Sequence, residues 1–214
     1  MSQKIDFHYF YMFCFVPVIL CAQNDEYQNW SNLGIGYNFS KKTELSIEGG
    51  LRSDVVSYEH VQYFSDFSIK RKHNSVVSYL AGFRYASDRK KNGFESKNRF
   101  YADFSIKKDL GLNFNVVCRN RFQAQHVLDY YVSKIRQKIK LNYDLKSISL
   151  DLYVSLELFY VLDGEFEKTR YVAGLKKSFW DTVDLGVGYM IQKELNTESS
   201  DLLYAFRTKI LYEF

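Results

Sequence analysis

Six basic residues at alternating positions are the clearest candidates for chemistry in this sequence: Arg119, Arg121, Lys134, Arg136, Lys138 and Lys140. Residues two apart lie on the same face of a β-strand, so each group would point its positive charges to one side. Guanidinium and ammonium groups gathered in this way attract anions and hydrogen-bond to them. We call these six residues the basic cluster, and we predict it as the place where an anion would bind.

The segments that carry the basic cluster are predicted to be β-strands within a longer series. Apolar and polar residues alternate in eleven stretches, which is typical of strands with two different faces. Most stretches contain ten to fourteen residues, whereas a tilted strand needs about 9–11 to cross a bilayer. The stretches cover residues 33–40, 43–52, 59–70, 75–87, 96–107, 112–125, 132–143, 148–160, 168–179, 183–194 and 202–214.

The connections between the predicted strands alternate in length. Short turns are expected at residues 41–42, 71–74, 108–111, 144–147 and 180–182, and longer polar links lie between them. Short turns at one rim and longer loops at the other are the organisation of an outer-membrane barrel. We therefore expect the short turns to be periplasmic and the longer loops to be extracellular.

The two faces of the predicted strands indicate a closed sheet in a membrane. Residues 149–160, for example, place leucine and valine on one face and serine, aspartate and glutamate on the other. A soluble β-sandwich alternates too, but it does not explain the strand lengths or the aromatic strand ends, such as Tyr37, Tyr143 and Phe179. In hydrocarbon every backbone N–H and C=O must be paired, so the sheet must close on itself.

We therefore predict an all-β fold, a closed antiparallel transmembrane β-barrel of 10 to 12 strands. Bacterial single-chain barrels prefer an even number of strands, and eleven stretches leave one unmatched. Either the polar segment "QNDEYQNW" at residues 23–30 supplies a twelfth strand, or it lies inside the barrel. Of these counts, we favour twelve.

The start of the chain predicts export. Residues 1–22 read as a cleaved signal peptide whose apolar core, residues 7–19, is too short to span a membrane. Lipidation of Cys21 is the alternative, but the bulky Leu20 precedes it. Residues 23–214 are predicted to form the barrel in the cell outer membrane of a Gram-negative bacterium. They contain no proline, which suits unbroken strands because each proline would remove a ladder donor.

The predicted inward faces carry more basic than acidic residues. Assigning faces by parity places seventeen basic and nine acidic residues inside. Two interpretations remain open: a network of ion pairs that fills a narrow barrel, or a positively biased pore that favours anions.

Enzymatic chemistry has little support in the sequence. His60 and His126 lie near the expected outer rim, with Asp54, Asp129 and Ser133 nearby in sequence. No spacing among them is typical of a nucleophile, a base and an orienting group. The scattered histidines and the one cysteine of the mature chain do not form a metal-ligand set. We predict no catalytic, cofactor-binding or metal site, and the dispersed basic residues do not indicate nucleic-acid binding.

Several motifs resemble those of the outer-membrane barrels catalogued as domain of unknown function 2490. They are an early Trp30, "SIEGGLR" at 46–52, "RNRFQAQ" at 119–125, "KIRQKIKLNY" at 134–143 and "LELFYVLDGEFEKTRYVAGLKKSF" at 156–179. The resemblance covers essentially the whole mature chain and implies a barrel fold and an outer-membrane location. It also implies a structural ion pair near the outer rim among Glu157, Glu167 and Arg170.

These observations predict an integral, porin-like barrel that acts as a narrow channel or as a structural or surface barrel. The alternative is an outer-membrane enzyme that acts on lipid or lipopolysaccharide at the outer rim. The expected partners are outer-membrane lipid and lipopolysaccharide, small anions, and the barrel assembly machinery. The last strand resembles the aromatic C-terminal signal read by that machinery, with Tyr212 and Phe214 as its key residues.

Overall fold

A computed structural model of the chain describes residues 25–90, 93–127, 130–162, 164–180, 182–195 and 202–214. The predicted signal peptide lies outside the described residues. No helix in the described part of the chain is long and apolar enough to cross a bilayer. A single turn of 3-10 helix, η3 (Lys146–Ile148), interrupts a series of strands.

Eleven strands of 12 to 19 residues make up the described chain, so the predicted all-β fold is confirmed. Their bounds are β1 (Glu26–Ser40), β2 (Thr43–Asp54), β3 (His60–Lys72), β4 (Val77–Lys90), β5 (Gly93–Gly111), β6 (Phe114–Val127), β7 (Tyr130–Leu145), β8 (Leu150–Val161), β9 (Glu165–Phe179), β10 (Val183–Glu194) and β11 (Leu202–Glu213).

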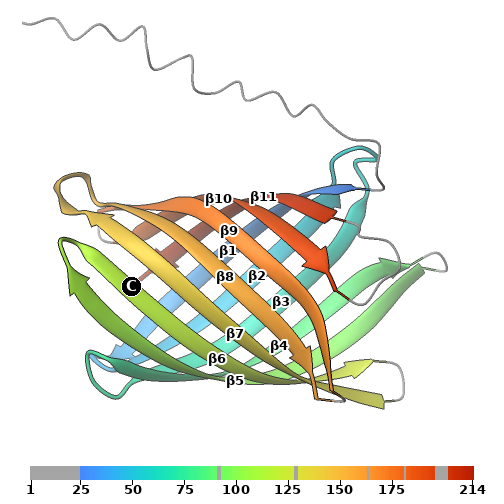
Figure 1. The fold of residues 1–214 in the computed structure, drawn as a ribbon, viewed down its shortest axis with the longest axis horizontal. Coiled ribbons are helices and arrows are strands. Elements are labelled where there is room, and N and C mark those ends of the chain that lie inside the picture. Colours follow the sequence, from blue (N-terminus) through green and yellow to red (C-terminus); the bar gives the residue numbers. More distant parts are fainter. Residues whose placement is uncertain (1–24, 91–92, 128–129, 163, 181, 196–201) are drawn as a thin grey trace, which may run out of the picture.

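The strands close into one barrel in sequence order, and β11 returns to lie beside β1 (Figure 1). Neighbouring strands are antiparallel except at this seam, where β1 and β11 run parallel. An odd number of strands in an up-and-down order can close only in this way. The backbone also joins the two ends, because Phe214 N–H donates to the Gly36 carbonyl at 3.0 Å.

The predicted count of twelve strands is wrong. Glu26 to Trp30, in the polar stretch considered as an extra strand, instead continue directly into the next stretch and form the first third of β1. This segment pairs with β11 from Glu26 onward, with Trp30 opposite Arg207. Cross-strand pairing on both edges therefore holds the polar stretch in β1.

One predicted turn is also displaced. The stretch at residues 108–111 was expected to be a turn, but Lys108 and Asp109 pair with β6 and extend β5. The turn lies at Leu112 and Asn113, whose φ angles are 50° and 67°. A two-residue turn in which both central residues have positive φ matches the twist of an antiparallel hairpin. The hairpin therefore turns at Leu112 and Asn113 and not at residues 108–111.

The barrel wall has apolar residues outside and charged residues inside. Val154 is 54% exposed, whereas Glu157, on the opposite face of the same strand, is 1% exposed. Asp103 and Arg121 are buried in the same way. Large apolar side chains lie on the outer surface of every strand, which reverses the arrangement of a soluble globular protein.

Glycines in the wall receive aromatic rings from the neighbouring strand. Gly50 lies directly opposite Phe64, and Gly82 directly opposite Tyr101. A Cβ atom at either glycine would overlap the facing ring. Each ring therefore extends over the glycine of the neighbouring strand and lies on the inner wall.

Gly50→Ala is expected to destabilise the barrel by about 1–3 kcal/mol, because the new methyl group displaces the buried Phe64 ring. Its neighbour Gly49 is the matched control, since a Cβ there has no atom closer than 3.9 Å. Gly49→Ala should not lower the free energy of unfolding, because alanine has space there and reduces the conformational entropy of the unfolded chain. Denaturant unfolding of the purified protein measures both, and equal losses would contradict the proposed contact.

Candidate functional site: the basic interior of the barrel

A cavity of about 590 Å³ occupies the interior of the barrel. Of the residues that the structure describes, fourteen basic and six acidic ones line it. A second cavity of about 430 Å³ adjoins the first and shares lining residues with it, among them Trp30, Lys138 and Arg207. Alternation along the strands sends these side chains inward, as Lys134, Arg136 and Lys138 illustrate on β7.

Glu157 on β8 is the centre of the interior charge network. Its carboxylate forms an ion pair with Arg136, and lies 3.0 Å from Lys138 Nζ. Arg170 and Arg119 approach the same carboxylate at 3.5 and 3.9 Å. Four cations from three strands therefore share one buried carboxylate.

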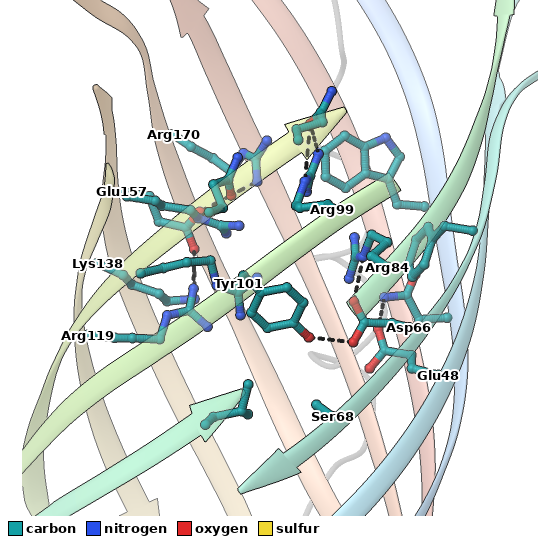
Figure 2. Close-up of a pocket in the computed structure, with 18 of the residues that line it drawn as sticks. Glu48, Asp66, Ser68, Arg84, Arg99, Tyr101, Arg119, Lys138, Glu157 and Arg170 are labelled. Atoms are coloured by element: carbon teal, nitrogen blue, oxygen red, sulfur yellow. Dashed lines mark hydrogen bonds and ion pairs between the residues drawn. The ribbon is translucent and has the colours of Figure 1, made fainter. Parts of the chain in front are cut away.

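Two aspartates continue the network along the wall. Arg121 donates two hydrogen bonds to Asp103, at 2.6 and 2.8 Å. Asp66 accepts from Arg84 Nε at 2.6 Å and from the Tyr101 hydroxyl at 2.5 Å. Figure 2 shows the Tyr101 ring between the group around Glu157 and the group around Asp66. Asp66 and Asp103 therefore extend the network of ion pairs from the group around Glu157 toward β3 and β4.

The aromatic faces carry guanidinium groups. Arg84 lies 3.9 Å from the centroid of Phe64, and Arg121 lies 3.8 Å from that of Tyr101. A cation over an aromatic face gains about 0.5–2 kcal/mol, and more when it is desolvated. Each ring that covers a glycine therefore also supports a charge.

The structure places all six residues of the basic cluster on the inner face. Arg119 lies opposite Lys138 and Arg121 opposite Arg136 on the paired strands β6 and β7. Lys140 lies in the second cavity, where its Nζ is 4.3 Å from the Tyr153 ring centroid. Members of the cluster thus differ in their partners: several share Glu157, whereas Lys140 faces an aromatic ring.

The implied rim ion pair is arranged differently from the expectation. Arg170 pairs with Glu157 inside the barrel, at 3.5 Å. Glu167 pairs instead with Lys134 at 2.6 Å and with Lys168 at 3.0 Å. A register shift between β8 and β9 next to Phe159 lets the adjacent residues Glu167 and Lys168 both line the cavity, so simple alternation does not describe this end of β9.

Asp88 and Trp30 also contribute to the interior, although simple alternation does not predict it. Asp88 falls in a predicted link, but β4 extends to Lys90, and Asp88 accepts from Lys97 at 2.7 Å. Trp30 falls in the polar segment before the first predicted strand, and it is 7% exposed inside the barrel. The alternation of Gln28, Trp30 and Asn32 was the available signal, and the polarity of the surrounding residues obscured it.

Two of the residues considered for hydrolysis have other contacts in the described part of the chain. His126 lies against the Tyr131 ring, with 4.8 Å between the centroids. The Asp54 carboxylate accepts from the backbone N–H groups of Val56 and Ser57, at 2.9 and 2.7 Å, and so shapes its own loop. Asp129 lies outside the described residues. Within the described ranges, no three His, Cys, Asp or Glu side chains are grouped to hold a metal ion.

A family model described as protein of unknown function, DUF2490, matches residues 27–202 of this chain. The chain belongs to the DUF2490 family. The resemblance noted from the sequence motifs is therefore confirmed. A comparison with curated proteins found no match for this DUF2490 barrel.

Glu157→Gln is expected to destabilise the barrel by about 3–5 kcal/mol, because it leaves buried cations without their shared counter-charge. Glu44→Gln is the control, since Glu44 pairs with Lys70 at 2.9 Å where both side chains are partly exposed. Its cost should be below about 1 kcal/mol. Denaturation midpoints compare the two variants, and a smaller loss for Glu157→Gln would overturn its central role.

Proposed function

We propose that this protein is an integral outer-membrane β-barrel with a narrow interior that favours anions. The observation that carries the proposal is the excess of basic over acidic side chains among the described residues that line the main cavity, fourteen against six. The excess persists when the neighbouring carboxylates Asp103, Glu95 and Glu194, which pair with lining cations, are included. Unbalanced positive charge within a low-dielectric wall raises the local concentration of anions and lowers the barrier to their entry. The partners of the interior are therefore small anions.

The outer surface supports a membrane environment. Exposed apolar side chains such as Ile35, Ile47 and Val154 cover the wall, and a soluble protein rarely exposes so continuous an apolar surface. Aromatic pairs lie toward both ends of the barrel, as Phe114 with Tyr143 and Tyr160 with Phe166. Rings at both ends of the strands suit the two lipid headgroup regions.

The interior network supports a narrow passage. Carboxylates such as Glu157 and Asp103 offset part of the positive charge and hold long side chains across the interior. Arg52, Arg99 and Arg207 also line the cavity, and within the described residues they form no ion pair. Their charges give the interior its positive bias. The two interpretations of the interior are therefore compatible: ion pairs fill most of the barrel, and the excess charge selects what enters the rest.

Location is tested by expressing the full chain with its N-terminal segment and separating the membranes. The protein is expected in the outer-membrane fraction, in contact with lipid and lipopolysaccharide. On a gel, its mobility should change on boiling, because a closed barrel resists detergent unfolding. Recovery as soluble periplasmic material with no such change would contradict the membrane assignment.

Conduction is tested with the purified barrel in planar bilayers under a salt gradient. The reversal potential should indicate preference for chloride over potassium. Replacing Lys134 and Lys168 together by Gln should reduce the permeability ratio by about twofold or more, since both line the cavity. Lys177→Gln is the control, because Lys177 lies on the opposite face of β9. A cation-selective current, or none, would contradict an anion-favouring channel.

A further inference from the structure

Three guanidinium groups surround Trp30 inside the barrel. The Arg52 Cζ lies 3.7 Å from the indole centroid, Arg170 5.2 Å and Arg207 5.9 Å. Trp30 on β1 is directly opposite Arg52 on β2 and directly opposite Arg207 on β11. The closing seam of the barrel therefore places Arg52 and Arg207 on either side of Trp30, although they are far apart in the sequence.

The charges at this point are poorly neutralised. Arg170 is engaged by Gln192 at 2.5 Å and by Glu157. Within the described part of the chain, neither Arg52 nor Arg207 has a carboxylate partner, and the buried Arg52 Nε has no hydrogen-bond partner. The charges of Arg170, Arg84 and Arg99 repel that of Arg52, and Asp88 is the carboxylate that attracts it.

The nearby acidic and polar groups do not fully neutralise the positive charge around Trp30. Asp88 is occupied by Lys97 and by Gln62. Among the described residues, Arg99 donates to the neutral Gln125, at 2.7 and 3.1 Å. Positive groups held together in a confined space repel each other unless an anion lies among them. A negative charge from outside the chain would relieve this repulsion.

We propose that Arg52 and Arg207, beside Trp30, bind an oxyanion of the phosphate type. Guanidinium groups present paired N–H donors that match the oxygens of phosphate, whereas chloride offers no such geometry. Both arginines and Trp30 line the main cavity, whose volume of about 590 Å³ accommodates a phosphate group. The site deepens and rests on the proposed anion-favouring interior, but it does not depend on ion conduction.

Trp30 provides a direct reporter for this site. The chain has two tryptophans, and the other, Trp180, is 84% exposed. In Trp180→Phe protein, purified and folded in detergent, the fluorescence of Trp30 would be followed during titration with inorganic phosphate. Sodium chloride at matched ionic strength is the reference. We expect a saturable change with phosphate that chloride does not reproduce.

Variants then assign the binding residues. Arg52→Gln or Arg207→Gln should weaken phosphate binding about tenfold or more, because each removes a charge-assisted donor pair. Arg52→Lys keeps the charge and should lose less affinity. Lys108→Gln removes one charge from an exposed position on β5 and should leave binding unchanged. Calorimetric titration repeats the measurement without relying on the indole, and the boiling-dependent gel shift confirms that each variant is folded.

Glucose 6-phosphate distinguishes free phosphate from a phosphate group on a larger molecule. Equal or tighter binding would identify a site open to substituted phosphates, whereas exclusion would restrict it to the free ion. The proposal would be overturned if phosphate binding did not saturate or if chloride gave an equal response. It would also be overturned if Lys108→Gln lost as much phosphate affinity as the arginine variants. Conductance and fractionation are measured separately, so a barrel that binds phosphate without conducting would refute the channel and retain the site.

Discussion

The parallel pairing of β1 with β11 is the contact on which the rest of this structure depends. It satisfies the last free edge of the sheet, and it sets the number of strands at eleven. A closed sheet of fixed strand number has a fixed radius, so the inward side chains of all strands share one narrow space. Charges in that space cannot keep the full hydration they would have at a surface, and their neighbours have to replace it.

The interior replaces that hydration with shared carboxylates and aromatic faces. Glu157 serves four cations, and Asp66 joins Arg84 to the Tyr101 hydroxyl. The aromatic rings reach this position because glycines on the neighbouring strand leave room for them. The apolar and ionic parts of the wall therefore depend on each other: a change at Gly82 moves Tyr101, and Tyr101 supports both Asp66 and Arg121.

The positive charges of the interior are neutralised to different extents in two regions, around Glu157 and around Trp30 at the seam. Around Glu157 the positive charges are held by a carboxylate of the chain itself, so that region acts mainly as a structural brace. Around Trp30, two arginines lack such a partner within the described ranges. An anion that enters the barrel would meet this region as its most favourable position, because there it gains charge-assisted hydrogen bonds without displacing an existing ion pair.

The sequence by itself determined the strand character, the direction of each side chain along most strands and the basic excess, because all three follow from a period of two. Lys134, Arg136 and Lys138 could be placed on one inward face for that reason. Only the tertiary structure decided the strand count, the turn at Leu112 and Asn113, and the inward position of Glu167. Closure and register are long-range pairings, and a bulge changes a face without leaving a pattern in the sequence. The site at Trp30 joins residues from the first and last strands, so only the closed barrel creates it.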